Sequence, residues 1–377
     1  MDAGFFRGRK KNMDEEQAES AFGFHGTWRE FAPIAFTNLL LIIVTLGIYR
    51  FWAKARERRY LWSRTRFIDE RLEWTGTGLE LFLGGVVVVL LFVVPYIVMT
   101  QVAQAMILRG ETAIGVALTV IPLLAIFYLM GVARFRAIRY RLGRTNWRGI
   151  RGGSDSKGFR YGWSYMWKTT LGYLAFGLGV PWAMVSLWNQ RWRLMSFGPM
   201  DFTCSADFSP LMKRYLLFYF SPFLAILVAA GAMFAIALGF AVDFDGAGGF
   251  DPEEPPIGFV AAVVVALFLF YFVLGFIWLV YFAKFYRVVV GHMALGDLEF
   301  EFDAKTKDWI KLGLGDVALV VLTLGIGFVF LGYRHWKFFV THMQAYGEIN
   351  VDDLTQSTTK RARHGEGLLD AFDMGAI

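Results

Sequence analysis

Cysteine and histidine are scarce in this chain of 377 residues. Cys204 is the one cysteine, which excludes an intrachain disulfide and any metal site built from several thiolates. The 5 histidines are scattered, and no pair has the helix-face spacing, with a carboxylate, that a catalytic zinc requires. We therefore predict no enzymatic activity, no metal and no cofactor.

Charged residues are also few. They make up 19% of the chain against 56% hydrophobic residues, which is too apolar a balance for a soluble protein. Residues 1–21 form a charged N-terminal tail without the apolar core of a signal peptide, so no cleavage is expected. The composition indicates a membrane protein.

Four stretches contain no charged residue at all, namely residues 81–108, 112–133, 215–242 and 255–283. A helix crosses the hydrocarbon core of a bilayer with about 20 apolar residues, and all four stretches exceed that length. The sequence therefore predicts a multi-pass membrane protein with four transmembrane helices.

Basic residues gather in the loops beside these helices, whereas residues 241–256 contain neither lysine nor arginine. The positive-inside rule then places the basic loops and both termini in the cytoplasm, and pairs the four helices into two hairpins. Since the basic residues adjoin membrane helices, we expect them to contact anionic lipid headgroups and not nucleic acid. The predicted headgroup collar comprises Lys54, Arg56, Arg59, Arg134, Arg139 and Lys284.

The sequence has three further apolar stretches, at residues 31–49, 169–190 and 317–333. If each of them crossed the membrane, the loops that follow would change sides and the topology above would no longer hold. A crossing by residues 169–190 would invert everything after it and turn basic loops outward. Glycine and proline in these stretches favour broken or re-entrant helices that leave on the side they entered. Three ordinary spans, giving seven in all, remain the alternative.

The three stretches share a short motif: Thr45-Leu46-Gly47-Ile48, Gly177-Leu178-Gly179-Val180 and Thr323-Leu324-Gly325-Ile326. Its predicted helix-breaking positions are Thr45, Gly47, Gly177, Gly179, Thr323 and Gly325. Seven residues before each motif lie Asn38, Thr170 and Asp316. Polar groups at matching membrane depth are costly unless they face protein or water, so Asn38 and Asp316 are a candidate shared polar site.

Short runs with alternating polarity follow the cytoplasmic helix ends at residues 72–75, 200–203, 298–302 and 348–351, with another at 22–25. Period-two alternation predicts strands that pair into a small cytoplasmic sheet. The predicted fold class is an all-α polytopic membrane protein with four transmembrane helices, three glycine-broken segments and short cytoplasmic β-strands. Residues 22–352 would form one membrane domain of repeats at about 22–150, 151–300 and, in part, 301–352, and residues 353–377 a disordered tail.

Several of these motifs also carry a family resemblance. The motifs are Phe24-His25-Gly26-Thr27, Thr45-Leu46-Gly47-Ile48-Tyr49, Phe51-Trp52-Ala53-Lys54 and Trp74-Thr75-Gly76-Thr77-Gly78. With them, residues 22–352 resemble the YjgN-like family of bacterial inner-membrane proteins. The resemblance implies a multi-pass protein of the bacterial inner membrane, and it implies no activity.

An acidic stretch at residues 243–254 has carboxylates around glycines. Oxygen ligands of this kind bind Ca²⁺, but the spacing departs from that of an EF-hand loop, and we interpret the stretch as a plain extracytoplasmic loop.

Two functions are compatible with these features. A transporter or pore for a small solute or lipid would explain the broken helices, because transporters build midplane sites from them. A non-transporting scaffold that organises lipid or partner proteins would explain the basic collar, and also the lack of an ionisable residue in the four spans. The broken helices make transport the first expectation.

Overall fold

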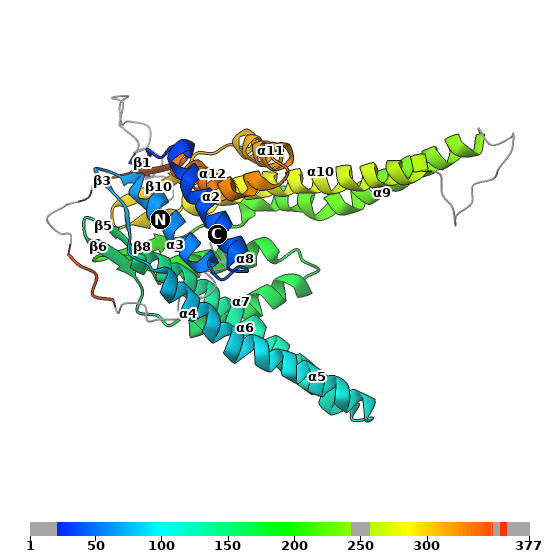
Figure 1. The fold of residues 1–377 in the computed structure, drawn as a ribbon, viewed down its shortest axis with the longest axis horizontal. Helices are drawn as coiled ribbons and strands as arrows, with labels where there is room; N and C mark the ends of the chain where they lie inside the picture. The colour runs from blue at the N-terminus through cyan, green and yellow to red at the C-terminus, as the bar shows by residue number, and fades with distance from the viewer. Residues whose placement is uncertain (1–20, 243–256, 348, 350–354, 360–377) are drawn as a thin grey trace.

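The computed structural model describes residues 21–242, 257–347, 349 and 355–359. Two long helical hairpins project from a body made of shorter helices and a sheet (Figure 1). The first hairpin runs through α4 (Gly78–Val88), the π-helical turn η1 (Val89–Val93) and α5 (Val94–Leu108), and returns along α6 (Thr112–Arg144). The second begins with η2 (Ser209–Leu211) and pairs α9 (Met212–Val242) with α10 (Ile257–Val290).

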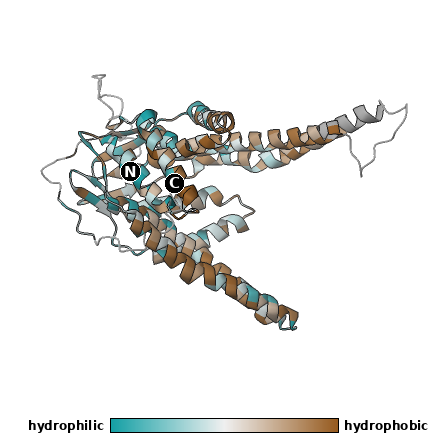
Figure 2. Cartoon of the chain, in the orientation of Figure 1, coloured by the Kyte–Doolittle hydropathy of each residue, from teal (hydrophilic) through white to brown (hydrophobic). Residues whose placement is uncertain are grey.

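These hairpins contain the helices long and apolar enough to cross a membrane. Four candidate spans lie within the described residues: Gly78–Leu108, Thr112–Arg144, Ser209–Gly231 and Val263–Val290. At most 17% of the residues in any of their apolar windows are buried, so the hydrophobic side chains point outward along both hairpins (Figure 2). A surface of this kind is stable in lipid and not in water.

Three shorter hairpins alternate with the long ones along the chain. They consist of α2 (Trp28–Val44) with α3 (Arg50–Ser63), α7 (Phe159–Leu174) with α8 (Val180–Trp192), and α11 (Thr306–Leu322) with η3 (Ile326–Phe330) and α12 (Leu331–Thr341). Their longest helix has 17 residues, roughly 25 Å, before the chain turns back. The three apolar stretches therefore fold as broken helices, and the alternative of seven ordinary spans fails.

The expectation of an all-α protein is wrong, because a β-sheet forms a layer of its own. The larger sheet has eight antiparallel strands in the order β11-β10-β9-β8-β7-β6-β5-β4, and a second has three in the order β1-β2-β3. The strands are β1 (Phe22–Phe24), β2 (Thr65–Phe67), β3 (Glu70–Arg71), β4 (Glu73–Trp74), β5 (Thr145–Trp147), β6 (Ile150–Gly153), β7 (Ser196–Phe197), β8 (Met200–Cys204), β9 (Met293–Leu295), β10 (Leu298–Phe302) and β11 (Met343–Tyr346).

Most of these strands are too short to be recognised singly. The runs at residues 22–25, 72–75, 200–203 and 298–302 do contain β1, β4, β8 and β10. The last strand, β11, lies before the run at 348–351, most of which falls outside the described residues. Because each β-hairpin adds to the edge left by the previous one, strands of two to five residues build one continuous layer.

The inner face of the sheet packs on the helices. Alternate residues Leu298, Phe300 and Phe302 of β10 are buried, together with Phe135 of α6 and Val289 of α10. A second core cluster joins the two ends of the chain: Trp62 of α3 stacks on Trp336 of α12 with ring centroids 4.0 Å apart. The Tyr333 hydroxyl donates a hydrogen bond to the Gly26 carbonyl at 2.9 Å.

Part of the C-terminal region, which we expected to be disordered, is bound to the sheet. Within residues 355–359, the Gln356 side chain donates to the Gly149 carbonyl at 2.8 Å and accepts from the Arg151 amide at 3.2 Å. Ser357 and Thr359 are buried. The described part of this tail therefore contacts β6 and the turn between β5 and β6.

Candidate functional site

The tips of the three short hairpins share an unusual backbone conformation. Two consecutive residues have positive φ: Leu46 (49°) and Gly47 (89°), Phe176 (51°) and Gly177 (81°), and Leu324 (51°) and Gly325 (92°). Glycine adopts this left-handed region freely, but an L-residue with a side chain pays about 1–2 kcal/mol there. A bulky apolar residue is thus held in a strained conformation at each tip.

The left-handed turns also correct the register of the middle motif. Helices α2, α7 and α11 end at the C-cap residues Thr45, Ala175 and Thr323, so Gly177 and not Gly179 corresponds to Gly47 and Gly325. Gly179 has φ −83° and precedes α8. It serves close packing instead, since a Cβ there would lie 3.0 Å from Gly172 Cα.

Threonine side chains stabilise two of the turns by hydrogen bonds. The Thr45 hydroxyl donates to the Leu41 carbonyl at 2.7 Å and accepts from the Tyr49 amide at 2.9 Å. Thr323 likewise donates to the Leu319 carbonyl and accepts from the Gly327 amide, both at 2.6 Å. Ala175 has no hydroxyl, and there Tyr215 of α9 donates to the Gly177 carbonyl at 2.7 Å. Each tip is therefore fixed by polar bonds while its apolar side chain stays free.

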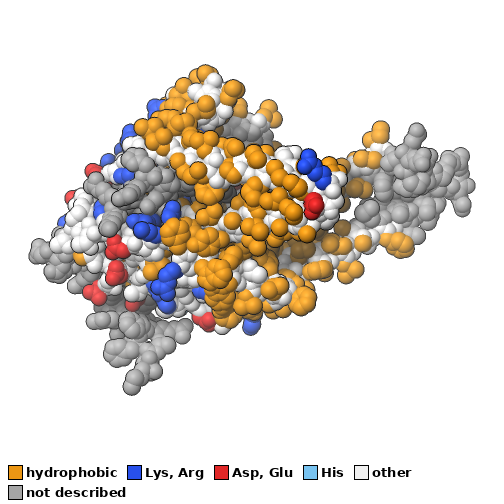
Figure 3. Space-filling view, turned by 90° about the horizontal axis from the view of Figure 1, so that it is seen from below, with side chains coloured by type: hydrophobic (Ala, Val, Ile, Leu, Met, Phe, Trp, Pro, Cys, Tyr) orange, Lys and Arg blue, Asp and Glu red, His pale blue; other side chains and the backbone are white. Residues whose placement is uncertain are grey.

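The apolar side chains at the tips contact almost nothing in the protein. Leu46 is 94% exposed, Phe176 85% and Leu324 93%. Other exposed apolar residues flank them at the ends of the first helices, among them Val44, Leu174 and Leu322. Figure 3 shows how widely hydrophobic side chains cover one face of the molecule.

A polar side chain joins the two helices of every short hairpin. Nine residues before the left-handed glycines lie Asn38, Lys168 and Asp316. The Asn38 amide donates to the Ala53 carbonyl of α3 at 3.3 Å. Lys168 donates to Ser186 at 2.8 Å and to Gln190 at 3.0 Å, both on α8.

Asp316 accepts from Arg334 and pairs with His335 of α12, each at 2.6 Å. The hydrogen bonds of Asn38 and Asp316 therefore stay within separate hairpins, and the shared polar site remains a prediction. Lys168 was missed, because the motif had been aligned on Gly179 and pointed to Thr170. Aligning the ends of the helices would have found it.

Asp316 is half-buried, and its surroundings determine its ionisation. Burial raises the pKa of the carboxyl, but the hydrogen bonds and charges of His335 and Arg334 outweigh burial and hold the pKa below the ordinary value of 3.8. The ionised carboxylate therefore stabilises the fold above pH 3.8, and that contribution is lost as the pH falls through the lowered value.

We expect Asp316→Asn to lower the free energy of unfolding by about 2 kcal/mol at neutral pH, since it loses charge-assisted bonds to a partly exposed arginine. Thermal unfolding in detergent, followed at decreasing pH, checks this. The difference from the wild type should vanish once Asp316 is protonated, and a difference that persists in acid would show that the carboxylate charge is not what stabilises the hairpin.

The predicted collar residues have different environments. Arg56 and Arg59 are exposed, and Lys54 forms an ion pair with Glu57 at 3.5 Å. Arg134 and Lys284 are half-buried. Arg139 is buried and donates to the Ser156 carbonyl at 3.2 Å. Its guanidinium therefore bonds within the protein and does not lie on the surface of the collar. The acidic stretch at 243–254 lies outside the described residues.

A cavity of about 350 Å³ lies at the sheet, far in the fold from the hairpin tips. Arg66 of β2, the β2–β3 turn residue Asp69 and the β5–β6 turn residue Arg148 line it, and Arg148 forms an ion pair with Asp69. Asn38 and Asp316 are not among its lining residues. This cavity therefore does not provide the midplane site that a transporter would need.

Taken together, membrane-length hairpins, half-length apolar hairpins and a capping sheet define an integral membrane protein. A family model for bacterial proteins of unknown function, DUF898, matches residues 19–371, and the chain belongs to that family. Its relatives include "Inner membrane protein YjgN" of Escherichia coli O157:H7, 30% identical over 131 residues, and the protein of the same name from Salmonella typhimurium strain LT2, 26% identical over 143 residues.

These two matches cover 35% and 38% of this chain, and only 30% and 33% of the relatives' own lengths. No solved structure is significantly similar.

Proposed function

We propose that this protein is a membrane scaffold that inserts three apolar hairpin tips into one leaflet and orders the lipids around them. The observation that carries the proposal is the strained, exposed residue at each tip. Burying a leucine or phenylalanine in hydrocarbon is worth about 1.5–3 kcal/mol, which offsets the roughly 1–2 kcal/mol of backbone strain. In water the exposed apolar side chain and the strained backbone would both be unfavourable, so lipid is the environment that suits these tips.

The length of the hairpins supports insertion into a single leaflet. A helix of 16 or 17 residues that begins beside the sheet and turns back cannot reach the far side of the bilayer with its apolar part. Three such half-length hairpins add volume to one leaflet only. A leaflet expanded in this way favours curvature, and the exposed arginines of α3 favour anionic headgroups beside the tips.

A single-chain pore is less well supported. The four candidate spans are buried over at most 17% of their apolar windows, so their surfaces face outward instead of enclosing a path. The observation that favours transport as a second candidate is the polar cluster of α7 and α8, where Lys168 bonds Ser186 and Gln190, and Gln190 donates to Ser164 at 2.9 Å. A transport path would then have to form between copies of the chain.

We further propose that the protein resides in the inner membrane, with the sheet and both termini in the cytoplasm. The names of its relatives support the membrane, and the positive-inside rule supports the orientation. This orientation places the three tips in the cytoplasmic leaflet.

Depth measurements test the scaffold. Single cysteines at positions 46, 176 and 324, in a protein with Cys204→Ser, are labelled with an environment-sensitive dye and placed in bilayers that contain brominated lipids. We expect blue-shifted emission and bromine quenching at all three positions, and neither at Arg56→Cys, which is exposed on α3. Water-like emission at the tips would refute insertion.

Flux measurements on the same vesicles separate the two functions. The scaffold predicts clustering of labelled phosphatidylglycerol and altered vesicle shape without solute or lipid flux. Flux that requires Lys168, in the absence of clustering, would favour the transporter.

A further inference from the structure

Arg191 is a buried arginine with an unpaired side-chain nitrogen in the described part of the chain. It lies one residue before the end of α8 and is 5% exposed. Its Nε is buried without a hydrogen-bond partner among the described residues. The guanidinium lies against the ring of Trp188, 5.1 Å from the ring centroid, so a π-system covers one face while the Nε donor lacks an acceptor among the described residues.

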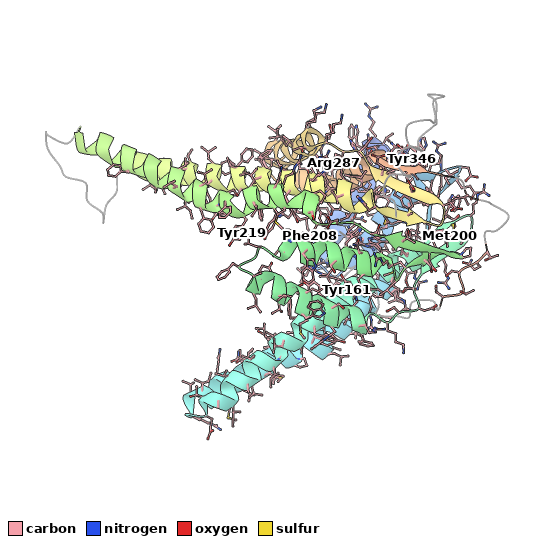
Figure 4. The ribbon with its side chains drawn as sticks, turned by 180° about the vertical axis from the view of Figure 1, so that it is seen from behind. Tyr161, Met200, Phe208, Tyr219, Arg287 and Tyr346 are labelled. Carbon is pink, nitrogen blue, oxygen red and sulfur yellow. The ribbon has the colours of Figure 1, made fainter. Side chains whose placement is uncertain are left out.

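The groups that surround Arg191 add donors and positive charge. Arg134 of α6 is close enough to repel it, as is Arg141, and the phenol groups of Tyr161 on α7 and Tyr286 on α10 lie nearby. The Tyr286 hydroxyl is itself buried without a hydrogen-bond partner in the described part of the chain. Figure 4 shows Tyr161 on α7, beside the long hairpin of α5 and α6.

Among the described residues, no ion pair joins a carboxylate to Arg134 or to Arg191. Burial lowers the pKa of Arg191, yet an arginine stays protonated at neutral pH. A buried charge without a counter-ion is strongly unfavourable, which indicates that an anion normally accompanies it.

Position along the chain indicates which anion fits. Arg134 directly follows the uncharged stretch 112–133 of α6, which places it at the depth of the lipid phosphates. It is half-buried, packs on Tyr165 with its guanidinium carbon 5.0 Å from the ring centroid, and lies close enough to Arg191 for the two charges to interact. Phosphate oxygens accept the parallel bonds that an arginine fork offers.

We propose that Arg191, together with Arg134 and Tyr286, binds a phosphate group at headgroup depth. The phosphate belongs either to an anionic lipid headgroup or to inorganic phosphate. This proposal is independent of the hairpin tips, because it rests on donors in the core between α6, α7, α8 and α10.

Thermal unfolding of the purified, delipidated protein in detergent tests the site with two probes, phosphatidylglycerol and inorganic phosphate. We expect phosphatidylglycerol to raise the unfolding temperature of the wild type by several degrees. Arg191→Gln should weaken the apparent affinity at least tenfold, whereas Arg71→Gln removes the same charge from an exposed position on β3, outside the predicted collar, and should leave it unchanged. Stabilisation by inorganic phosphate to the same extent assigns the site to free phosphate.

A second readout distinguishes binding from a structural role. Without any anion, Arg191→Met should unfold at a higher temperature than the wild type, because it removes an uncompensated charge. Native mass spectrometry of the wild type should show one tightly retained phospholipid or phosphate that Arg191→Lys retains less well. If Arg191→Met is less stable than the wild type and neither probe stabilises the wild type, the proposal is overturned.

Discussion

Aspartate in place of Leu46, Phe176 and Leu324 is expected to abolish stable assembly of the protein in the membrane. Each substitution loses the burial of an apolar side chain, worth about 1.5–3 kcal/mol, and adds a charge whose insertion costs about 2.5–3.5 kcal/mol at full depth. The combined loss over three tips is about 12–20 kcal/mol, which is comparable to or larger than the stability of a typical domain, about 5–15 kcal/mol. The yield of the protein in the membrane fraction measures the effect.

A matched control separates polarity from side-chain shape. The triple variant Leu46→Met, Phe176→Leu and Leu324→Met keeps three apolar tips and should assemble like the wild type, because these side chains are 85–94% exposed and contact little of the protein. Normal assembly of the aspartate variant would show that the tips do not enter the bilayer.

Leucine at Gly131 is expected to separate α6 from α7 and to lower the free energy of unfolding by about 3 kcal/mol. A Cβ at this position would lie 2.6 Å from Tyr165 Cβ and 3.0 Å from Gly162 Cα, so the two helices cross with backbone almost against backbone. At Gly162, an added Cβ would in turn collide with the Val132 side chain. Small residues at such crossings let membrane helices approach closely.

Thermal unfolding in detergent measures this loss. Gly275→Leu serves as the control, because a Cβ there would meet no heavy atom within 4 Å although the residue lies in a candidate span. Equal unfolding temperatures for both variants would show that the contact between α6 and α7 does not stabilise the protein.

The membrane helices were predictable because lipid imposes a simple rule: a spanning segment has no charge for about 20 residues. The break at Gly47 was also predictable, since leucine-glycine after a threonine interrupts a helix where the apolar run is too short to cross. Alternating polarity also indicated short strands, including the run that contains β4, but not the extent of the sheet. The partner of Glu73 and Trp74 in β4 is β5, which is 71 or more residues away, and the sequence carries no local signal for this pairing.

The sequence also did not show which arginines are buried. Arg139 and Arg191 resemble collar arginines in the sequence, because both stand beside tryptophan or tyrosine at the end of a membrane-associated helix. Only tertiary packing distinguishes an arginine that reaches headgroups from one enclosed in a core. The register of Lys168 was missed for a related reason: glycine recurs at 177 and 179, and only the backbone angles show which one turns the chain.

The contact between Trp62 and Trp336 has a consequence for how the protein is made. Strands β4 to β11 add to the sheet in chain order, so each helical hairpin can enter the membrane and take its place soon after synthesis. Helix α12 returns to the first hairpin, where Trp336 stacks on Trp62 and donates to Thr65 at 2.9 Å, and Phe330 of η3 packs on Phe31 of α2 with ring centroids 6.1 Å apart. These contacts form only after the ribosome has delivered η3 and α12, so the first hairpin completes its packing late in synthesis.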